Sequence, residues 1–319
     1  MQITTIICTY NRAESLRRTL TTLVEVERPP GVDWETILVD NNSTDNTAQV
    51  CSEFQGRLPL RYAMEQKRGK SIALNTAIGL STADLLLFTD DDVDFDPRWL
   101  TGYADAAARM PDVPFFVGRI LARLEGKPPP WSAKHAHSLL AQLSVHFDAG
   151  TAECPMEAAY GANMAIRAEV FRRGISFRSH LGPVGPKRIS SEDAQLFQDI
   201  QASSGPNIGV YVPAALLFHR TVRSRMTESY VRKWFFADGV ARVLRNQIDP
   251  AVTLFGVPRY LWRQLLESTL RYAALRPFSA SRLWLVQEIQ MARTLGIISE
   301  LRRAKRRKAP GSALKAPCA

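Results

Sequence analysis

Cysteine is scarce in this chain of 319 residues, which contains four. The cysteines lie far apart and never at CxxC spacing, at Cys8, Cys51, Cys154 and Cys318. This spacing excludes a zinc knot and a disulfide framework, and it fits a reducing compartment. The chain also lacks an uninterrupted apolar run of the roughly 20 residues that a membrane-spanning helix requires.

The first apolar run does not resemble a secretion signal. The apolar run that starts at Ile3 has no basic leader and contains Thr4 and Thr5. We therefore expect a cytoplasmic protein.

Acidic residues are absent from residues 301–319, which contain seven lysines and arginines, while the whole chain has a net charge of +10. Most of the excess charge therefore lies in this tail. We expect a disordered basic arm there, either solvated or bound to anionic lipid head groups. Because the charge is concentrated in the tail, it does not favour nucleic acid as a partner.

Short segments that alternate between strand and helix patterns fill the first 90 residues. Strand patterns occupy 3–10, 34–42, 60–66 and 83–90, and helix patterns occupy 12–26, 43–54 and 69–81. This alternation predicts a mostly parallel sheet, whose ligands bind at the carboxyl ends of the strands. Polar motifs stand at these ends: TYNR, VDNNSTD, KRGKS and TDDD.

The regular alternation of strand and helix patterns ends after Pro97. Strands are predicted at 114–124 and 207–220, and a helix at 189–205, whereas 157–171 reads as a strand followed by the start of a helix. Three further helices are predicted at 230–244, 260–275 and 281–296. We expect one large domain at 1–225 with halves at 1–97 and 98–225, a helical region at 226–300 and the basic tail at 301–319.

Three carboxylates in a row, Asp90, Asp91 and Asp92, follow the strand pattern at 83–90. Like charges about 4 Å apart repel by roughly 1 kcal/mol in water and about 4 kcal/mol when partly desolvated. A divalent cation, Mg²⁺ or Mn²⁺, would relieve this repulsion and bridge to phosphates. The alternative is a solvated turn followed by a helix cap, which accounts for Asp94 and Asp96.

Five motifs occur in a fixed order: CTYNR, LVDNNSTDNT, RGKSIALN, FTDDDV and SEDAQL. This ordered set resembles the family 2 inverting glycosyltransferases over about Ile3 to His219. The resemblance implies an α/β fold of GT-A type, Rossmann-like, with a mostly parallel central sheet flanked by helices and here a C-terminal helical extension. It implies a hexosyltransferase that moves a sugar from a nucleotide diphosphate, with UDP favoured, to a hydroxyl of a glycan, polysaccharide or glycolipid acceptor.

The resemblance assigns the nucleotide to Thr9, Tyr10, Asn11, Asp40, Lys67, Gly69, Lys70 and Asp90. Asp40 matches a carboxylate that hydrogen-bonds the base, and the alternative is a helix-capping role beside Asn42 and Ser43. Lys67, Arg68 and Lys70 contact phosphate or are surface charges on a turn. The GxxxxGK[ST] spacing of a P-loop is absent.

The resemblance assigns the metal to Asp91 and Asp92, with His219 as a further ligand, and places Asp90 near the ribose. Thr89 stands where many members have the first Asp, which leaves the register of the triplet open. A packed or surface role is the alternative for His219. A histidine pair at His135 and His137 is a weaker metal candidate, with no acid run nearby.

The SED motif matches the catalytic acidic pair of the family, in which Asp193 is the general base and Glu192 its neighbour. The alternative is a helix N-terminus, where both acids are favoured by the dipole. Asn163, with Gly161, matches a segment beside the acceptor and donor sugar, and turn chemistry explains it nearly as well.

Other functions stay open from the sequence. A sugar-phosphate nucleotidyltransferase would need a glycine-rich loop after the first strand, and CTYNRAES has no glycine. A non-catalytic nucleotide-sugar or carbohydrate-binding module, or a membrane-surface scaffold, is the alternative from another class.

An apolar stripe lies along the predicted helix at 260–275. It either packs against the catalytic domain or forms an amphipathic face that binds the membrane interface. In the second case the protein would be peripheral on the cytoplasmic side of the inner membrane and would meet a lipid-linked acceptor there. The members of the stripe are Trp262, Leu265, Leu266, Leu270 and Tyr272.

Overall fold

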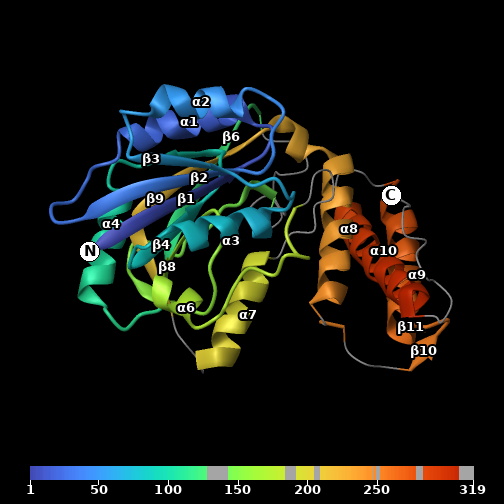
Figure 1. Cartoon of the computed structure of the whole chain (residues 1–319). Helices are drawn as coiled ribbons and strands as arrows, with labels where there is room; N and C mark the ends of the chain where they lie inside the picture. Colours follow the sequence, from blue (N-terminus) through green and yellow to red (C-terminus); the bar gives the residue numbers. More distant parts are fainter. Residues whose placement is uncertain are drawn as a thin grey trace, which may run out of the picture. The chain divides into compact units, whose positions relative to one another are not determined.

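The computed structural model describes residues 1–127, 143–183, 192–204, 209–245, 247–248, 252–277 and 283–308. The described residues up to Met226 form one compact unit, and those from Thr227 form a second (Figure 1).

Four parallel strands form the first half of the sheet in the first unit. β1 (Gln2–Thr9) pairs with β2 (Asp33–Asp40) and β4 (Leu85–Thr89), and β2 pairs with β3 (Leu60–Met64). The connections run through α1 (Ala13–Val24), α2 (Thr47–Phe54) and α3 (Lys70–Leu80). The predicted alternation of strand and helix is therefore confirmed.

The second half of the sheet is mixed. Its strands are β5 (Val93–Phe95), β6 (Phe115–Leu124), β7 (Cys154–Met156), β8 (Asn163–Arg167) and β9 (Gly209–Thr221). β8 runs antiparallel to β4 and β6, while β9 runs parallel to β6 and antiparallel to β5 and β7. The sheet order among the described residues is β3-β2-β1-β4-β8-β6-β9-β5, and β7 pairs with β9.

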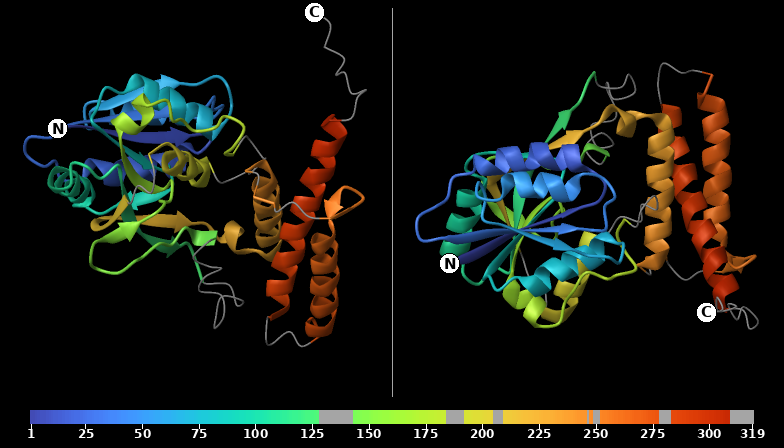
Figure 2. Two further views of the ribbon diagram at one scale, coloured as in Figure 1. Left: turned by 90° about the horizontal axis from the view of Figure 1, so that it is seen from below. Right: turned by 45° about the horizontal axis from the view of Figure 1, so that its top comes forward.

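Helices cover both faces of this sheet (Figure 2). Side chains alternate along a strand, so Ile3 and Ile7 of β1 enter one core while Ile6 enters the other. The first core receives residues of α1, α2 and α4 (Trp99–Arg109). The second receives residues of α3, α6 (Ala168–Arg172) and α7 (Glu192–Ser204). A short 3₁₀ turn, Arg223–Met226, closes the unit.

The second unit consists of three long helices and a small hairpin. They are α8 (Glu228–Leu244), β10 (Thr253–Leu254), β11 (Val257–Pro258), α9 (Arg259–Leu275) and α10 (Leu283–Lys308). α8 and α10 approach closely at Gly239 and Gly296. A Cβ on Gly239 would collide with the carbonyl oxygen of Arg293, and a Cβ on Gly296 would collide with that of Phe236.

Two expectations for this unit change. Helix α10 continues through Lys308, so the arm expected to be disordered from residue 301 begins as helix, and 309–319 lie outside the described residues. The α9 stripe is divided, because Trp262 and Leu265 pack on the core of this unit while Leu266 and Leu270 are exposed. No helix in the described part of the chain is long and apolar enough to cross a membrane.

Candidate functional site

Polar side chains gather in the first unit where β1, β2 and β4 end. Because the three strands are parallel neighbours, their carboxyl ends lie at one edge of the sheet. The loops after β1 and β2 are tied together there, since the Asn11 carboxamide accepts from the Thr44 amide at 2.7 Å and Asp45 accepts from the Ala13 amide at 2.9 Å. Asn11 adopts a φ of 51°, a conformation that Asn tolerates better than most residues.

The three consecutive carboxylates each meet a cation of the protein. Lys70 Nζ lies 2.7 Å from Asp90 Oδ1. The Arg12 guanidinium bridges the other two, pairing with Asp91 and lying 2.8 Å from Asp92 Oδ2. Arg225 lies 3.1 Å from the same Asp92 oxygen. The crowding is therefore compensated by arginine and lysine side chains from other segments.

Burial affects the acids of the triplet differently. Asp91 and Asp92 are 4% and 3% exposed. Burial raises the pKa of Asp91 to about 6, against the opposing charge of Arg12. Burial also acts on Asp92, but His219, Arg12 and Arg225 outweigh it and hold the pKa of that carboxyl well below its usual range. Asp92 is thus the firmly ionised member of the pair.

The solvated-turn interpretation is wrong for Asp94. This residue lies in β5 and is buried, where it pairs with Arg220 and with Arg123 at 2.5 Å. Arg220 also donates to the Val93 carbonyl at 2.6 Å. Asp96 does cap the following turn, because its carboxylate accepts from the Arg98 amide at 3.0 Å.

Three side chains around Asp92 form an arrangement that could hold a metal ion, called the metal arrangement below. One ligand atom each of Asp90, Asp92 and His219 lies within 4.8 Å of the others. His219 is 1% exposed, its Nε2 lies 3.3 Å from Asp92 Oδ1, and its Nδ1 has no hydrogen-bond partner among the described residues. Two carboxylates and an imidazole with an orphaned buried nitrogen suit Mn²⁺ or Mg²⁺.

Asp91, which the resemblance favours as chief ligand, lies outside this group. Its carboxylate accepts from the Thr9 hydroxyl at 2.7 Å and pairs with Arg12. Thr9, expected to bracket the base, is buried and holds Asp91 in place. The structure thus brings Asp90 to the metal arrangement in place of Asp91.

Asp40 is buried at the end of β2 with both carboxylate oxygens engaged. The Ser43 amide donates to Oδ1 at 2.8 Å, and the Tyr62 hydroxyl donates to Oδ2 at 3.0 Å. Asp40 therefore stabilises the turn after β2 and does not cap α2, whose N-cap residue is Asn46. Nearby, the Arg68 guanidinium stands 5.0 Å over the Tyr10 ring.

The loop after β3 is held by an asparagine to which sequence reasoning gave no role. The Asn41 side chain donates to the Lys67 carbonyl at 2.9 Å and accepts from the Gly69 amide at 2.7 Å. Gly69 has a φ of 145°, which favours glycine over other residues. The backbone of Lys67 and Gly69 is thereby fixed beside the end of β2.

Lys70 connects the acid triplet with the second acidic pair. In addition to Asp90, its Nζ lies 3.5 Å from Glu192 Oε1. Burial disfavours the Lys70 charge, but Asp90 and Glu192 outweigh it and raise the pKa of Lys70. Burial raises the pKa of Glu192, against the opposing effect of Lys70. The two acidic motifs are therefore parts of one site.

Asp193 and Gly161 are adjacent. The Gly161 amide donates to Asp193 Oδ2 at 3.1 Å, and the Ala194 amide donates to Oδ1 at 2.7 Å. Both acids stand in the first turn of α7, where the helix dipole favours ionised carboxylates. Ser191, His135 and His137 lie outside the described residues.

Asn163 is a core residue, contrary to the expected place beside the sugar. It is 0% exposed and its amide is fully engaged. Trp99 Nε1 and the Tyr103 hydroxyl donate to its oxygen at 2.8 and 2.9 Å, and its nitrogen donates to the carbonyls of Arg119 and Ala215. The pairing of β6 with β9 shifts register between Gly118 and Arg119, and this amide supplies hydrogen bonds there.

Sequence reasoning also gave no role to Arg12. The sequence signal for such a residue was the triplet itself, because adjacent carboxylates, two of which are buried, require counter-charges. The contact spans 79 positions to Asp91, so no local spacing could identify it.

Similarity to known proteins agrees with this geometry. The family described as "Glycosyl transferase family 2" matches residues 4–174. The chain is 21% identical over 254 residues to the glucosyl-dolichyl phosphate glucuronosyltransferase of Haloferax volcanii, covering 78% of this chain and 79% of that protein. It is 24% identical over 237 residues to the succinoglycan biosynthesis protein ExoM of Rhizobium meliloti, covering 73% and 71%.

Among solved structures, the chain resembles the mannosyltransferase PcManGT from Pyrobaculum calidifontis in complex with GDP-Man and Mn²⁺. The TM-score is 0.60 at 19% identity, and the match covers 93% of this chain and 86% of that one. At this identity the likeness concerns the fold alone.

Proposed function

The chain belongs to glycosyltransferase family 2 and has the GT-A fold, and we propose that it transfers a sugar, with inversion, from a nucleoside diphosphate to a hydroxyl of a glycan or lipid-linked acceptor. UDP is the proposed nucleotide, on the strength of the motif resemblance. We place this activity in the cytoplasm, which the free cysteines Cys8, Cys51 and Cys154 support.

One observation carries the proposal. Lys70 joins Asp90 of the triplet to Glu192 of the second acidic pair, with Nζ at 2.7 and 3.5 Å. Glycosyl transfer needs a group that stabilises a departing diphosphate and another that accepts a proton from the attacking hydroxyl. A half-buried cation that links Asp90 and Glu192, 102 positions apart in the chain, brings these two requirements into one site.

We propose that Asp90, Asp92 and His219 hold the divalent cation. When bound, Mg²⁺ or Mn²⁺ neutralises charge on the departing diphosphate. Arg12 and Arg225 keep Asp92 ionised, which the lowered pKa of that carboxyl supports. Asp91 positions Arg12 and Thr9 and is not proposed as a ligand.

We propose Asp193 as the general base. Its carboxylate takes the proton of the acceptor hydroxyl while the acceptor oxygen forms its bond to the anomeric carbon. The bond between that carbon and the diphosphate oxygen breaks, and the nucleoside diphosphate leaves with the electron pair. The amides of Gly161 and Ala194 donate to the two oxygens of Asp193 and fix their orientation.

The name of the archaeal relative supports an acceptor attached to lipid. The archaeal relative is described as acting on a glucosyl-dolichyl phosphate, and the rhizobial relative functions in the biosynthesis of succinoglycan. We propose a membrane-linked sugar as the acceptor class for this chain.

The decisive experiment is calorimetric titration of UDP, GDP and dTDP into the purified protein, with Mn²⁺ and again with EDTA. We expect one nucleotide, UDP, to bind with Mn²⁺ and to lose most of its affinity in EDTA. His219→Asn should reduce the gain in UDP affinity that Mn²⁺ gives over EDTA. Absence of binding by every nucleotide in both conditions would overturn the proposal.

The assignment of the base has a separate test. Asp193→Asn should lower transfer by about 10²–10⁴-fold, the usual contribution of base catalysis, and should leave nucleotide binding intact. Asp199→Asn is the matched control, because Asp199 lies on the same helix and pairs with Arg178 at 2.6 Å. Transfer is measured as nucleoside diphosphate released from UDP-sugars in the presence of acceptor. Equal rates for the two variants would show that Asp193 is not the base.

A further inference from the structure

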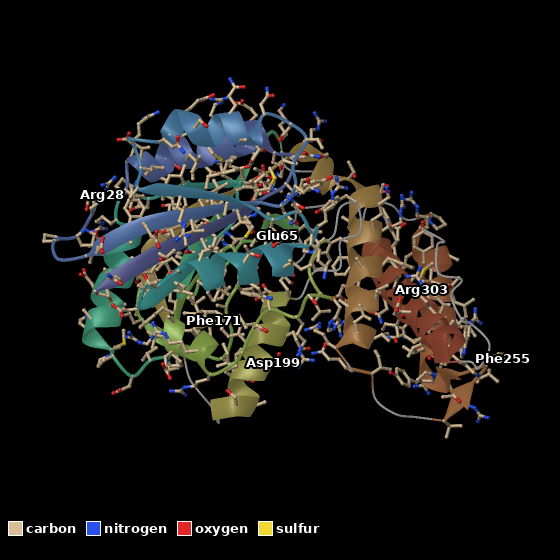
Figure 3. All side chains as sticks on the ribbon, in the orientation of Figure 1. Arg28, Glu65, Phe171, Asp199, Phe255 and Arg303 are labelled. Atoms are coloured by element: carbon tan, nitrogen blue, oxygen red, sulfur yellow. The ribbon has the colours of Figure 1, made fainter. Side chains whose placement is uncertain are left out.

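The hairpin of the second unit ends in an exposed apolar tip. Phe255 is 77% exposed between β10 and β11, and Val252 and Leu254 beside it are 68% and 43% exposed. Figure 3 labels Phe255 at this hairpin. We refer to Leu254 and Phe255 as the apolar tip, and Val252 lies at the base of the hairpin.

The backbone at the tip disfavours this residue choice. Leu254 pairs with Val257, which leaves Phe255 and Gly256 as a two-residue turn with φ of 54° and 76°. A two-residue hairpin with positive φ at both positions favours Asn-Gly, because a bulky side chain in the left-handed region is disfavoured. An exposed phenylalanine there gains little packing energy to offset the backbone strain, so its presence indicates that the side chain contacts another molecule.

An aromatic ring and basic side chains adjoin the apolar tip. Trp262 Nε1 donates to the Leu254 carbonyl at 3.1 Å, and the Arg302 guanidinium stands 5.1 Å over the Trp262 ring. A Cβ on Gly256 would lie 3.1 Å from Lys305 Nζ, which places the Lys305 side chain against the turn.

The cations at this hairpin are available to an anionic partner. Arg259 is exposed and its amide donates to the Val252 carbonyl at 2.9 Å at the hairpin base. Arg302 and Lys305 are also exposed. In the part of the chain that the structure covers, no carboxylate forms an ion pair with any of these three side chains.

We propose that the apolar tip inserts into the interface of an anionic lipid bilayer. A phenylalanine at the point of a turn enters the acyl boundary, tryptophan suits the head-group level, and lysine and arginine side chains pair with anionic head groups. A protein partner of ordinary size would bury about 800 Å² on each side, for which a protruding two-residue turn is a poor template. The combination of apolar tip and unpaired cations favours the bilayer.

The test is co-sedimentation of the full chain with vesicles of phosphatidylcholine alone or mixed with phosphatidylglycerol. We expect binding to the mixed vesicles that weakens with salt. Phe255→Ser should reduce the partition coefficient about ten-fold or more, as expected for a buried phenylalanine, and Lys305→Glu should reduce it about five-fold or more.

Val286→Ser is the matched control. Val286 is 55% exposed on α10, about 28 Å along that helix from Lys305 at 1.5 Å per residue. This variant should bind like the unaltered protein. A second readout uses Phe255→Trp, whose added fluorescence should be quenched by brominated lipid.

The proposal fails if the unaltered chain does not sediment with anionic vesicles. It also fails if Phe255→Ser and Val286→Ser bind equally well, or if brominated lipid leaves the added tryptophan unquenched. Nucleotide binding by Phe255→Ser should be unchanged. A loss of vesicle binding with intact nucleotide binding therefore separates this proposal from the transferase chemistry.

Discussion

Replacement of Asn163 by alanine tests whether this residue supports the core or contacts a sugar. Its carboxamide meets four partners at 2.8 to 2.9 Å: Trp99 Nε1, the Tyr103 hydroxyl and the carbonyls of Arg119 and Ala215. Alanine removes the side-chain partner of all four groups. No neighbouring ladder hydrogen bond replaces it, because β6 and β9 change register at this point.

The expected loss of stability is large. A buried polar group left unpaired costs about 1–3 kcal/mol, so four such groups predict a loss of at least about 4 kcal/mol in the free energy of unfolding. This is a large fraction of the roughly 5–15 kcal/mol that stabilises a typical domain.

Urea unfolding measures the change in the free energy of unfolding. Hydrogen exchange of peptides from β6, β8 and β9, as a second experiment, shows whether the loss of stability lies in these strands. Asn46→Ala is the matched control, because Asn46 is exposed and its side chain makes no capping hydrogen bond. This control should change stability by less than about 0.5 kcal/mol. If Asn163→Ala were as stable as the control and lost only sugar transfer, our account of a core residue would be refuted.

Three further predictions concern packing and charge. Gly239→Ala should lower the free energy of unfolding of the second unit by about 1–3 kcal/mol or more, because its Cβ would collide with backbone of α10. Gly79→Ala is the control, because open space surrounds Gly79, and this variant should stabilise α3 by about 0.5–1 kcal/mol. Arg220→Met should cost about 3–5 kcal/mol in urea unfolding, because Asp94 would lose its buried partner, and a cost below 1 kcal/mol would contradict this. For Glu192, burial raises the folded pKa above the unfolded value of about 4.3. The protonated form therefore stabilises the fold at low pH and this contribution is lost as pH rises. Glu192→Gln should gain stability relative to the unaltered chain as the pH rises above about 4, and a pH-independent difference would be inconsistent with this account.

The parallel half of the sheet could be predicted because its signals are local. Apolar β-branched runs alternate with helical periodicity over short distances, and each predicted strand up to Thr89 matches an observed one. The motifs at the strand ends then predicted the place of the site, since parallel strands expose their carboxyl ends at one edge.

The internal partners of the site could not be predicted from spacing. The triplet Asp90 to Asp92 indicated that positive charge was needed, and the sequence pattern itself predicted a divalent cation. Asp90 meets Lys70, 20 positions away, but the arginines that meet Asp91 and Asp92 are Arg12 and Arg225, at separations of 79 and 133 positions. Asn163 was misassigned for the same reason, since its four partners lie 44 to 64 positions away.

The family, the parallel half-sheet and the acids proposed to carry the chemistry follow from the amino-acid order, because periodicity and motifs are properties of neighbouring residues. Which acid faces the metal arrangement, which acid is held by Arg12, and which asparagine is buried emerge when distant segments meet. Burial and ion pairing depend on distance in space, and only the folded chain sets those distances.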